Sequence, residues 1–223
     1  MSTNKCPNCG ESVKGFLSNE LIEQSKVDFI NKHLNKNKEG YCSGWACSVK
    51  LLNEIADSFR KQKSEIETRL KRIIHYIPVI TSPAPTKWDY EIIDMVTAQT
   101  TAGTGFVTEL SRSFNDFFGQ SSNSTNQKVT NATSLCTSDL RVQCVRMGGN
   151  AIISTDIDFN EIGAGSTNML MVCMAGTAIK VNDMSNFSLK RSEIITEIID
   201  LTAQLEAIAE QAKVKTSNNI AQT

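Results

Sequence analysis

Four cysteines near the start of the chain have the residue type and the spacing of a metal site. Cys6 and Cys9 enclose two residues in the run CPNCG, and Cys42 and Cys47 form a second pair with four residues between them. Thiolates on such a turn bind one metal ion together, and four thiolates complete the tetrahedral shell that zinc prefers. A shell of four protein ligands leaves no position open for a substrate, so the pattern predicts a structural Zn²⁺ ion.

Alternatives to this zinc site stay open at the level of sequence. The four thiols could be free in a flexible head, or one pair could be redox-active. His33 could also replace one thiolate, although we expect it to be a solvated helix residue. The remaining cysteines lie in apolar stretches, where a free thiol behaves as a small hydrophobic side chain; they are Cys136, Cys144 and Cys173. The odd total of seven argues against a disulfide framework and fits a cytoplasmic protein.

A second candidate site is acidic. Asp156 and Asp158 are two positions apart in a predicted strand, so their side chains point the same way, and Glu161 follows closely. Carboxylates on one face suit a hard cation. The alternative, which we favour, is that these carboxylates are solvated or hydrogen-bond to a neighbouring subunit.

The sequence lacks the common enzyme motifs. It has no Gly-rich phosphate loop, no Gly-x-Ser-x-Gly and no His-Glu-x-x-His, and neither of its two histidines stands beside a candidate nucleophile. We therefore assign no catalytic residue and no cofactor-binding residue, and we expect a non-enzymatic protein.

Two apolar runs near the end of the chain form the centre of the predicted fold. They span residues 148–159 and 169–181, and their β-branched residues predict neighbouring strands of a sheet. The first run alternates, with one face made by Ala151, Ile153, Thr155, Ile157 and Phe159. The second run is apolar on both faces. One layer of helices covers only one of them, so we expect another subunit to cover the other.

Further strands and helices are predicted before these two runs. Residues 79–81 form a short edge strand in a proline-rich segment, and residues 86–103 contain a longer strand. Apolar residues that recur every three or four positions predict two helices. Phe106, Leu110, Phe114 and Phe117 mark the first, and Val129, Ala132, Cys136, Leu140, Cys144 and Met147 mark the second.

Two long helices flank this region. The first, over residues 48–74, carries an apolar stripe: Leu52, Ile55, Phe59, Ile66, Leu70 and Ile73. The second, over residues 188–213, carries a heptad seam: Ile194, Ile198, Leu201, Leu205, Ile208 and Ala212. We expect the two stripes to pack on each other within the chain, with packing between subunits as the alternative. The first helix also has a basic face, but Glu65 and Glu67 are mixed into it, which favours a solvated face over a nucleic-acid-binding arm.

The order of these elements and several of their motifs resemble the YbjQ-like family of heavy-metal-binding domains over about residues 76–182. The most specific motifs are the strand GGNAIISTDIDF, the following EIG and the closing GTAIK. The resemblance implies an α+β subunit in which helices pack on one face of a small antiparallel sheet. It also implies that subunits close into a ring, typically a pentamer.

The expected organisation has five parts. They are a zinc-ribbon-like head (1–48), an amphipathic helix (49–75), the YbjQ-like α+β domain (76–182), a C-terminal heptad helix (188–213) and a disordered tail (214–223). The net charge of −1, the lack of an apolar run of about 18 to 20 residues and the polar N-terminus predict a soluble cytoplasmic protein that binds neither membrane nor nucleic acid.

The expected function is that of a homo-oligomeric metal-binding and assembly protein, whose zinc head could dock a protein partner. The alternatives are a nucleic-acid-binding protein, which would use the head and the basic helix, and an uncharacterised enzyme.

Overall fold

The computed structural model describes residues 4–13, 18–101, 125–162 and 169–217. The chain divides into two compact units, Met1–Glu65 with Ile208–Thr223, and Ile66–Ala207. Each unit has a hydrophobic core of its own. The helix expected from Phe106 to Phe117 lies outside the described residues.

The first unit is built on the helix α1 (Gln24–Leu34), the π-helical turn η1 (Trp45–Val49) and the start of the helix α2 (Lys50–Ile73). Val27 and Ile30 stand three positions apart on α1, so both face inward, and both are fully buried. They pack with Tyr41, with Ile55 of α2 and with three of the cysteines of the head. Cys6, Cys42 and Cys47 therefore belong to the hydrophobic core of this unit, whereas Cys9 is exposed.

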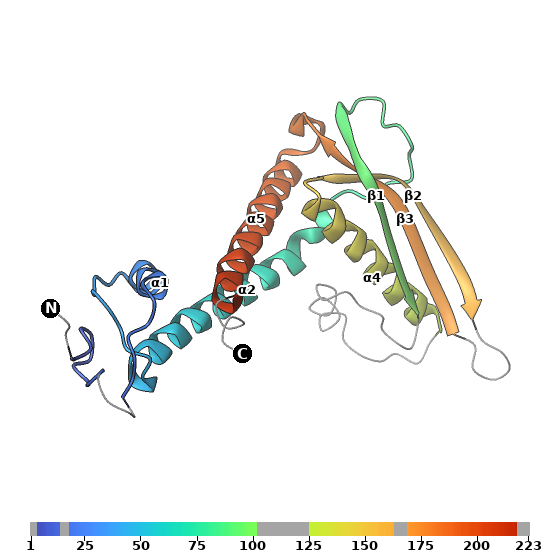
Figure 1. Ribbon diagram of the computed structural model, residues 1–223. Helices are drawn as coiled ribbons and strands as arrows, with labels where there is room; N and C mark the ends of the chain where they lie inside the picture. The colour runs from blue at the N-terminus through green and yellow to red at the C-terminus, as the bar shows by residue number, and fades with distance from the viewer. Residues whose placement is uncertain (1–3, 14–17, 102–124, 163–168, 218–223) are drawn as a thin grey trace. The chain divides into compact units, whose positions relative to one another are not determined.

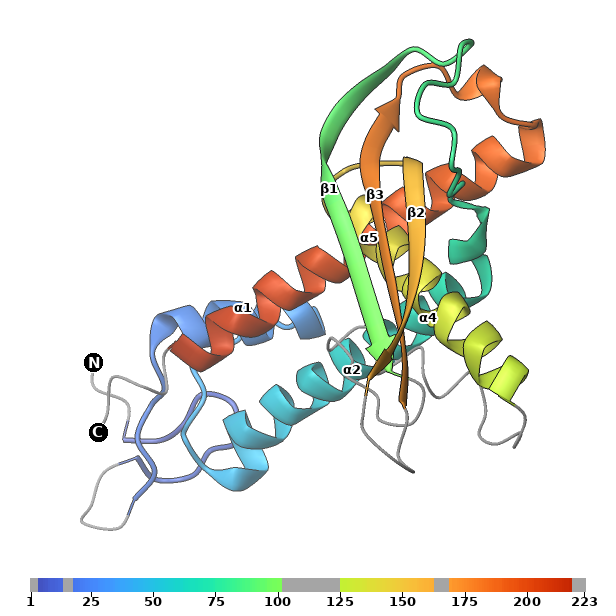
Figure 2. The same ribbon diagram turned by 90° about the vertical axis from the view of Figure 1, so that its right-hand side faces the viewer.

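The second unit is organised around an antiparallel sheet of three strands (Figures 1 and 2). The strands are β1 (Tyr90–Thr101), β2 (Ala151–Ile162) and β3 (Met169–Val181), in the order β1-β3-β2. The expected edge strand at residues 79–81 is present as a parallel bridge between Val79 and Ile152 on the free side of β2. Hydrogen bonds of 2.9 Å from Ile80 N to Ile152 O and from Ile152 N to Pro78 O hold it there.

The helix α4 (Thr125–Arg146) lies against one face of this sheet, as Figure 1 shows. Four of its buried side chains recur every four residues on one side of the helix and pack in the core of the sheet; they are Ala132, Cys136, Leu140 and Cys144. The inward-facing residues of the strands complete the core: Val96, Ala98, Ile152, Val172, Met174 and Ala178. The expected α+β fold, with a helix on one face of a small antiparallel sheet, is confirmed.

The motif residues Gly149 and Asn150 hold the start of β2 to the end of β3. The Asn150 amide donates to Val181 O at 2.9 Å and accepts from Val181 N at 2.7 Å, so it pairs as a backbone peptide would. A Cβ atom on Gly149 would stand 2.6 Å from Cys144 Sγ, which leaves room only for glycine. These residues of the GGNAII run have structural roles.

The expected alternation of the first apolar run is wrong, because β2 contains a bulge. Ser154 has a φ of 53°, and the register with β3 shifts between Ile153 and Asp156. Ile153 pairs with Thr177 before the bulge, and Ile157 pairs with Met174 after it, so the two isoleucines face opposite sides of the sheet.

The second run alternates in its burial from Met171 to Ala178, whereas Ile179 and Val181 beyond this stretch are both buried. Val172, Met174 and Ala178 are buried against α4, whereas a half-buried row faces the other way. That row consists of Met171, Cys173, Ala175 and Thr177. On the neighbouring β1, Met95 pairs with Thr177 and therefore shares this outer face, where its side chain is 66% exposed. The outer face of the sheet is thus partly apolar.

Within the second unit, a two-pronged ion pair joins the flanking helices α2 and α5 (Leu189–Ser217). Arg69 Nε and Nη2 donate to the two carboxylate oxygens of Glu197 at 2.6 and 2.8 Å.

The seam of α5 differs from expectation at its start, since Ile195 and Ile198 are fully buried while Ile194 is half-buried. The helix α5 is described as far as Ser217 and so includes the first four residues of the stretch expected to be a disordered tail. No helix in the described part of the chain is long and apolar enough to cross a membrane.

Candidate metal centre

The first cysteine pair sits on a short hairpin. Lys5 and Ser12 form its bridge, Cys6 N donates to Glu11 O at 2.8 Å, and Gly10 N donates to Cys6 O at 2.9 Å. Gly10 has a φ of 78°, a left-handed conformation that glycine adopts without strain. The tight turn explains why the sequence places a glycine directly after Cys9.

The second pair is positioned by the entry into a helix. Cys42 lies on a bridge with Leu21, and Cys47 lies within η1, the turn that leads into α2. Between them, a Cβ atom on Gly44 would stand 2.7 Å from Asn19 Nδ2 and 3.3 Å from Cys42 Sγ. A side chain at residue 44 would therefore have to displace the Asn19 amide and would crowd the sulfur of Cys42.

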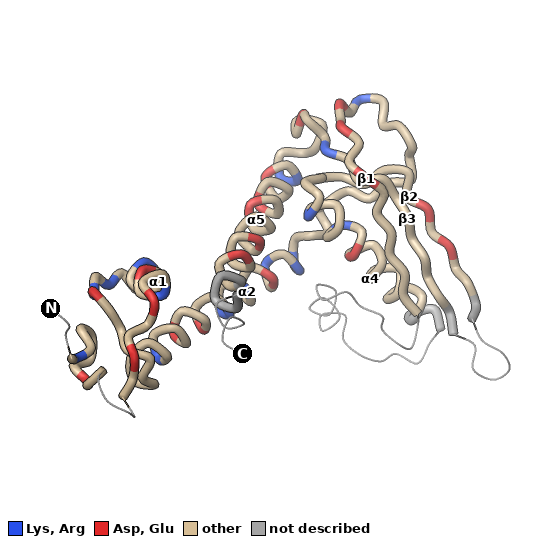
Figure 3. Tube along the Cα trace, viewed as in Figure 1, with Lys and Arg blue, Asp and Glu red and all other residues tan. Residues whose placement is uncertain are grey.

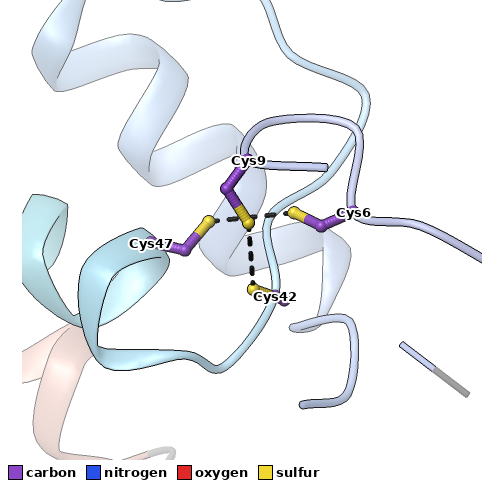
Figure 4. A group of neighbouring side chains, drawn as sticks. All are labelled: Cys6, Cys9, Cys42 and Cys47. Atoms are coloured by element: carbon purple, nitrogen blue, oxygen red, sulfur yellow. Dashed lines mark hydrogen bonds between the residues drawn. The ribbon is translucent and has the colours of Figure 1, made fainter. Parts of the chain in front are cut away.

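The four sulfur atoms meet in one cluster, with every pair within 4.8 Å (Figure 4). Cys6 Sγ and Cys47 Sγ are 3.8 Å apart, and Cys9 Sγ and Cys42 Sγ are 3.6 Å apart. Four sulfurs at the usual zinc–sulfur distance of about 2.3 Å stand about 3.8 Å from one another in a tetrahedron. A disulfide would need about 2.05 Å, so the spacing fits a shared metal ion and all four cysteines are free thiols.

Burial and hydrogen bonds act on these thiols in opposite directions. Burial opposes ionisation of Cys6, but the backbone N–H groups of Cys9 and Asn8 donate to its sulfur and the pKa falls to about 7. Burial raises the pKa of Cys42 to about 12 against the hydrogen bond from Gly44. At neutral pH, at least Cys42 is therefore protonated unless a cation occupies the cluster.

Asn8 is a part of the centre that the cysteine pattern alone does not reveal. Its side-chain amide donates to Cys47 Sγ at 3.3 Å and so links the hairpin that carries the first pair to the turn η1. Such a contact orients a ligand and stabilises negative charge on its sulfur. In the sequence, the signal for this role was the position of Asn8 between Cys6 and Cys9, where its amide side chain lies close to the sulfur atoms.

His33 does not belong to the sulfur cluster, which among the described residues consists of the four cysteines alone. Its ring centre lies 4.2 Å from that of Phe29, with the two rings tilted by 39°, and 5.3 Å from that of Phe59 in an edge-on contact. Its Nδ1 lies 2.8 Å from Phe29 O. The ring is half-buried, so the expectation of a solvated histidine is wrong.

The acidic candidates are not gathered into a ligand set. Asp156 and Asp158 are exposed and pair with Ala175 and Cys173, which puts both on the outer face of the sheet. Asp158 is already bonded, since it accepts from Phe159 N at 2.9 Å and from Asn160 Nδ2 at 2.8 Å. Glu161 pairs with Leu170 in the register of β2, but its side chain lies outside the described residues. In the part of the chain that is described, only the four cysteines form a group with metal-binding geometry.

The cysteines of the second unit behave as apolar core residues. Cys136 Sγ contacts Val172 O at 3.6 Å and Cys144 Sγ contacts Ala151 O at 3.3 Å. Burial raises the pKa of Cys136 to about 11 and that of Cys144 to about 12, so both are protonated and unreactive at neutral pH. Cys173 is half-buried on the outer face of the sheet.

Comparison with known proteins places the second unit in a family. Residues 77–182 match the YbjQ family model, described as "Putative heavy-metal-binding". A UPF0145 protein of Acetivibrio thermocellus is 32% identical over 87 residues, which cover 39% of this chain and 81% of the relative. A UPF0145 protein of Clostridium botulinum is 28% identical over 102 residues, 45% of this chain and 95% of the relative.

Among solved structures, a Pediococcus pentosaceus protein of unknown function from the DUF74 family is similar to this chain. It shares 19% identity at a TM-score of 0.30, and the match covers 47% of this chain and 96% of that one. The cysteine head lies before the region that the family model matches.

Proposed function

The chain belongs to the YbjQ family, and on that premise we propose that it is a non-enzymatic, homo-oligomeric assembly protein whose head is held together by a structural zinc ion. Cys6, Cys9, Cys42 and Cys47 would be the ligands of this ion. The observation that carries the proposal is the cluster of four thiol sulfurs, in which every pair lies within 4.8 Å.

Zinc fits the donor set better than a hard cation does. Thiolates favour zinc and other soft or borderline ions, whereas calcium and magnesium favour oxygen ligands. Three of the four cysteines are buried, and all four positions of a tetrahedral shell come from protein. The ion would therefore supply stability and no open site for chemistry.

The role of such an ion follows from what the ligands connect. One pair comes from the hairpin at residues 4–13, and the other from the segment that opens α2. The core that lies between them is small, and domains of this size commonly need a metal to remain folded. The zinc ion would cross-link these two segments.

The outer face of the sheet supports the oligomeric part of the proposal. It carries the half-buried apolar row of β3 and the exposed Met95 of β1, and α4 covers the opposite face. Burying such a surface against further copies of the chain would remove apolar area from water. A pentameric ring is the arrangement that we expect.

Nucleic-acid binding has less support. Several cations of α2 are paired with carboxylates: Arg60 with Asp57, Lys61 with Glu65 at 4.0 Å, and Arg69 with Glu197. These pairs reduce the positive charge that a phosphate backbone would meet.

Native mass spectrometry of the full chain tests both parts of the proposal, because it reads subunit number and bound metal together. We expect one discrete oligomer, a pentamer, that carries about one zinc ion per subunit. The double variant Cys6→Ser with Cys9→Ser should lose the zinc, and the control Cys173→Ser should keep it. Zinc content that is unchanged in the double variant would reject the metal site, and a monomer at high protein concentration would reject the ring.

A further inference from the structure

The four thiols of the head differ in how easily a dissolved molecule can reach them. Cys6, Cys42 and Cys47 are buried, with exposed fractions of 3%, 0% and 1%. Cys9 is exposed. It stands on the turn of the hairpin, directly before Gly10, and a Cβ atom on Gly10 would meet nothing within 4 Å. A reagent from solution therefore reaches the Cys9 sulfur before the other three.

The exposed thiol has a buried thiol close beside it. Cys9 Sγ lies 3.6 Å from Cys42 Sγ. The other close contact, of 3.8 Å, joins Cys6 and Cys47. Both contacts run between the hairpin and the segment that opens α2, and neither lies within a cysteine pair of the sequence (Figure 4). An exposed cysteine with a second thiol beside it is the arrangement in which oxidation is reversible, because the second thiol converts the first oxidation product into a disulfide.

We propose that the metal centre is a peroxide-sensitive switch, in which oxidation joins Cys9 to Cys42 and removes two of the four metal ligands. This inference rests on the proposed zinc site, because a bound zinc ion keeps its cysteines in the thiolate form that attacks peroxides.

The oxidant that fits this surface is small and uncharged, as hydrogen peroxide is. The hairpin at residues 4–13 carries one side chain of each charge, Lys5 and Glu11, which Figure 3 shows in blue and red. A surface of balanced charge gives a charged oxidant no net attraction.

The two steps of the oxidation conserve atoms and electrons. The Cys9 thiolate attacks one oxygen of hydrogen peroxide, the O–O bond breaks, and the products are a sulfenic acid on Cys9 and one hydroxide ion. The Cys42 thiolate then attacks the Cys9 sulfur, an S–S bond replaces the S–O bond, and a second hydroxide ion leaves. The two sulfurs together lose two electrons, which the peroxide gains.

The closure needs only a short movement of the hairpin turn. The sulfurs of Cys9 and Cys42 must approach from 3.6 Å to the disulfide bond length of about 2.05 Å. Cys47 is less suited to react first, since it is buried and its sulfur accepts a hydrogen bond from the Asn8 amide. Once two of the four thiolates form a disulfide, the tetrahedral shell is broken and the ion is released.

The test is to treat the zinc-loaded full-length protein with a limited amount of hydrogen peroxide. A zinc-binding dye then measures the released metal, and mass spectrometry of the cysteine-containing peptides locates the oxidised residues. We expect the parent to lose about one zinc ion and about two free thiols per chain, and to contain a disulfide between Cys9 and Cys42. Dithiothreitol with added zinc should restore the thiols and the bound metal.

Two histidine variants separate the roles of the cysteines. Cys9→His keeps a zinc ligand but removes the exposed sulfur, so it should keep its zinc over the time in which the parent loses it. The matched variant Cys6→His retains the thiols of Cys9 and Cys42, and it should lose zinc as the parent does. If either variant fails to bind zinc, the peptide map of the parent decides the question.

Two kinds of result would overturn the proposal. Zinc-loaded protein that keeps its zinc under peroxide, or that loses it without a disulfide between Cys9 and Cys42, would reject the switch and leave the zinc site standing. Protein that takes up no zinc before peroxide is added would reject the zinc site, and the switch with it.

Discussion

Gly44, a residue without a side chain, lies directly beside the metal centre. Because a Cβ atom there would meet Asn19 Nδ2 at 2.7 Å and Cys42 Sγ at 3.3 Å, Gly44→Ala should displace the second ligand pair. We expect zinc affinity to fall by about tenfold or more, since a strained contact of this kind costs about 1 to 3 kcal/mol. Competition with a chromophoric chelator measures the change.

Gly40→Ala is the matched control for this variant. A Cβ atom at residue 40 would meet Pro7 Cγ at 3.6 Å, an ordinary contact, so zinc affinity should stay at the parental value. Equal affinities in the two alanine variants would show that residue 44 tolerates a side chain and that the described entry into η1 is wrong.

The pKa values of Cys6 and Cys42 predict how zinc binding depends on pH. Zinc binds thiolates, so each thiol that is protonated in the metal-free protein must release its proton on binding. Since Cys42 has a pKa of about 12, Cys9 a raised pKa and Cys6 a pKa of about 7, binding at pH 7 releases one proton each from Cys42 and Cys9 and about half a proton from Cys6.

Zinc affinity should therefore rise with pH across the range from about 6 to 8, and zinc-dependent stability should be lost as the pH falls. Titrations in buffers of different ionisation enthalpy measure the protons released. An affinity that is flat over this range would mean that the cluster is already fully ionised without metal, contrary to the burial of Cys42.

At the scale of secondary-structure elements, Asn150 joins the start of β2 to the end of β3. Replacing it with alanine removes two hydrogen bonds and leaves the N–H and C=O of Val181 buried without a partner. Asn150→Ala should therefore lower the free energy of unfolding by about 2 to 4 kcal/mol. Denaturant unfolding followed by circular dichroism measures it.

Asn182→Ala supplies the comparison. Asn182 is exposed, and its side chain makes only a long contact of 3.4 Å to Asp89 among the described residues. Its loss should change stability by less than about 0.5 kcal/mol. If Asn150→Ala changed the free energy of unfolding by as little as Asn182→Ala, the hydrogen bonds between the Asn150 side chain and Val181 would not be what stabilises this end of the sheet.

Periodic patterns in the sequence predict most of the elements that the structure describes. The spacing of Ala132, Cys136, Leu140 and Cys144 predicts the buried side of α4 correctly, because a helix imposes that repeat on any sequence that covers a sheet. The four cysteines of the head can be grouped from spacing alone, since few other roles place thiols in that pattern.

The errors arise where tertiary contacts overrule the local pattern. Ser154 carries no sequence signal for a left-handed conformation, and the bulge follows from pairing β2 with Val79 on one side and β3 on the other. His33 resembles a solvated helix residue until Phe59 of another helix is placed beside it. The same holds for Ile195, which only the packing of α5 distinguishes from Ile194.

At the scale of the whole molecule, the two compact units have separate cores and should respond to different perturbations. Removing zinc with a chelator should lower the unfolding temperature of the first unit and leave that of the second unchanged. Leu140→Ala truncates a fully buried side chain of the second core, at a cost of about 2 to 5 kcal/mol. It should lower the unfolding temperature of the second unit and leave that of the first unchanged. Differential scanning calorimetry resolves the two transitions. A single transition that shifts equally in both experiments would contradict their independence.

The central claim, a zinc ion bound by four thiolates of the head, is tested most directly by X-ray absorption spectroscopy at the zinc edge of the purified full-length protein. We expect a first shell of sulfur alone, with four scatterers at about 2.3 Å. A shell that contains nitrogen or oxygen, or protein that purifies without zinc and does not take it up, would contradict the account.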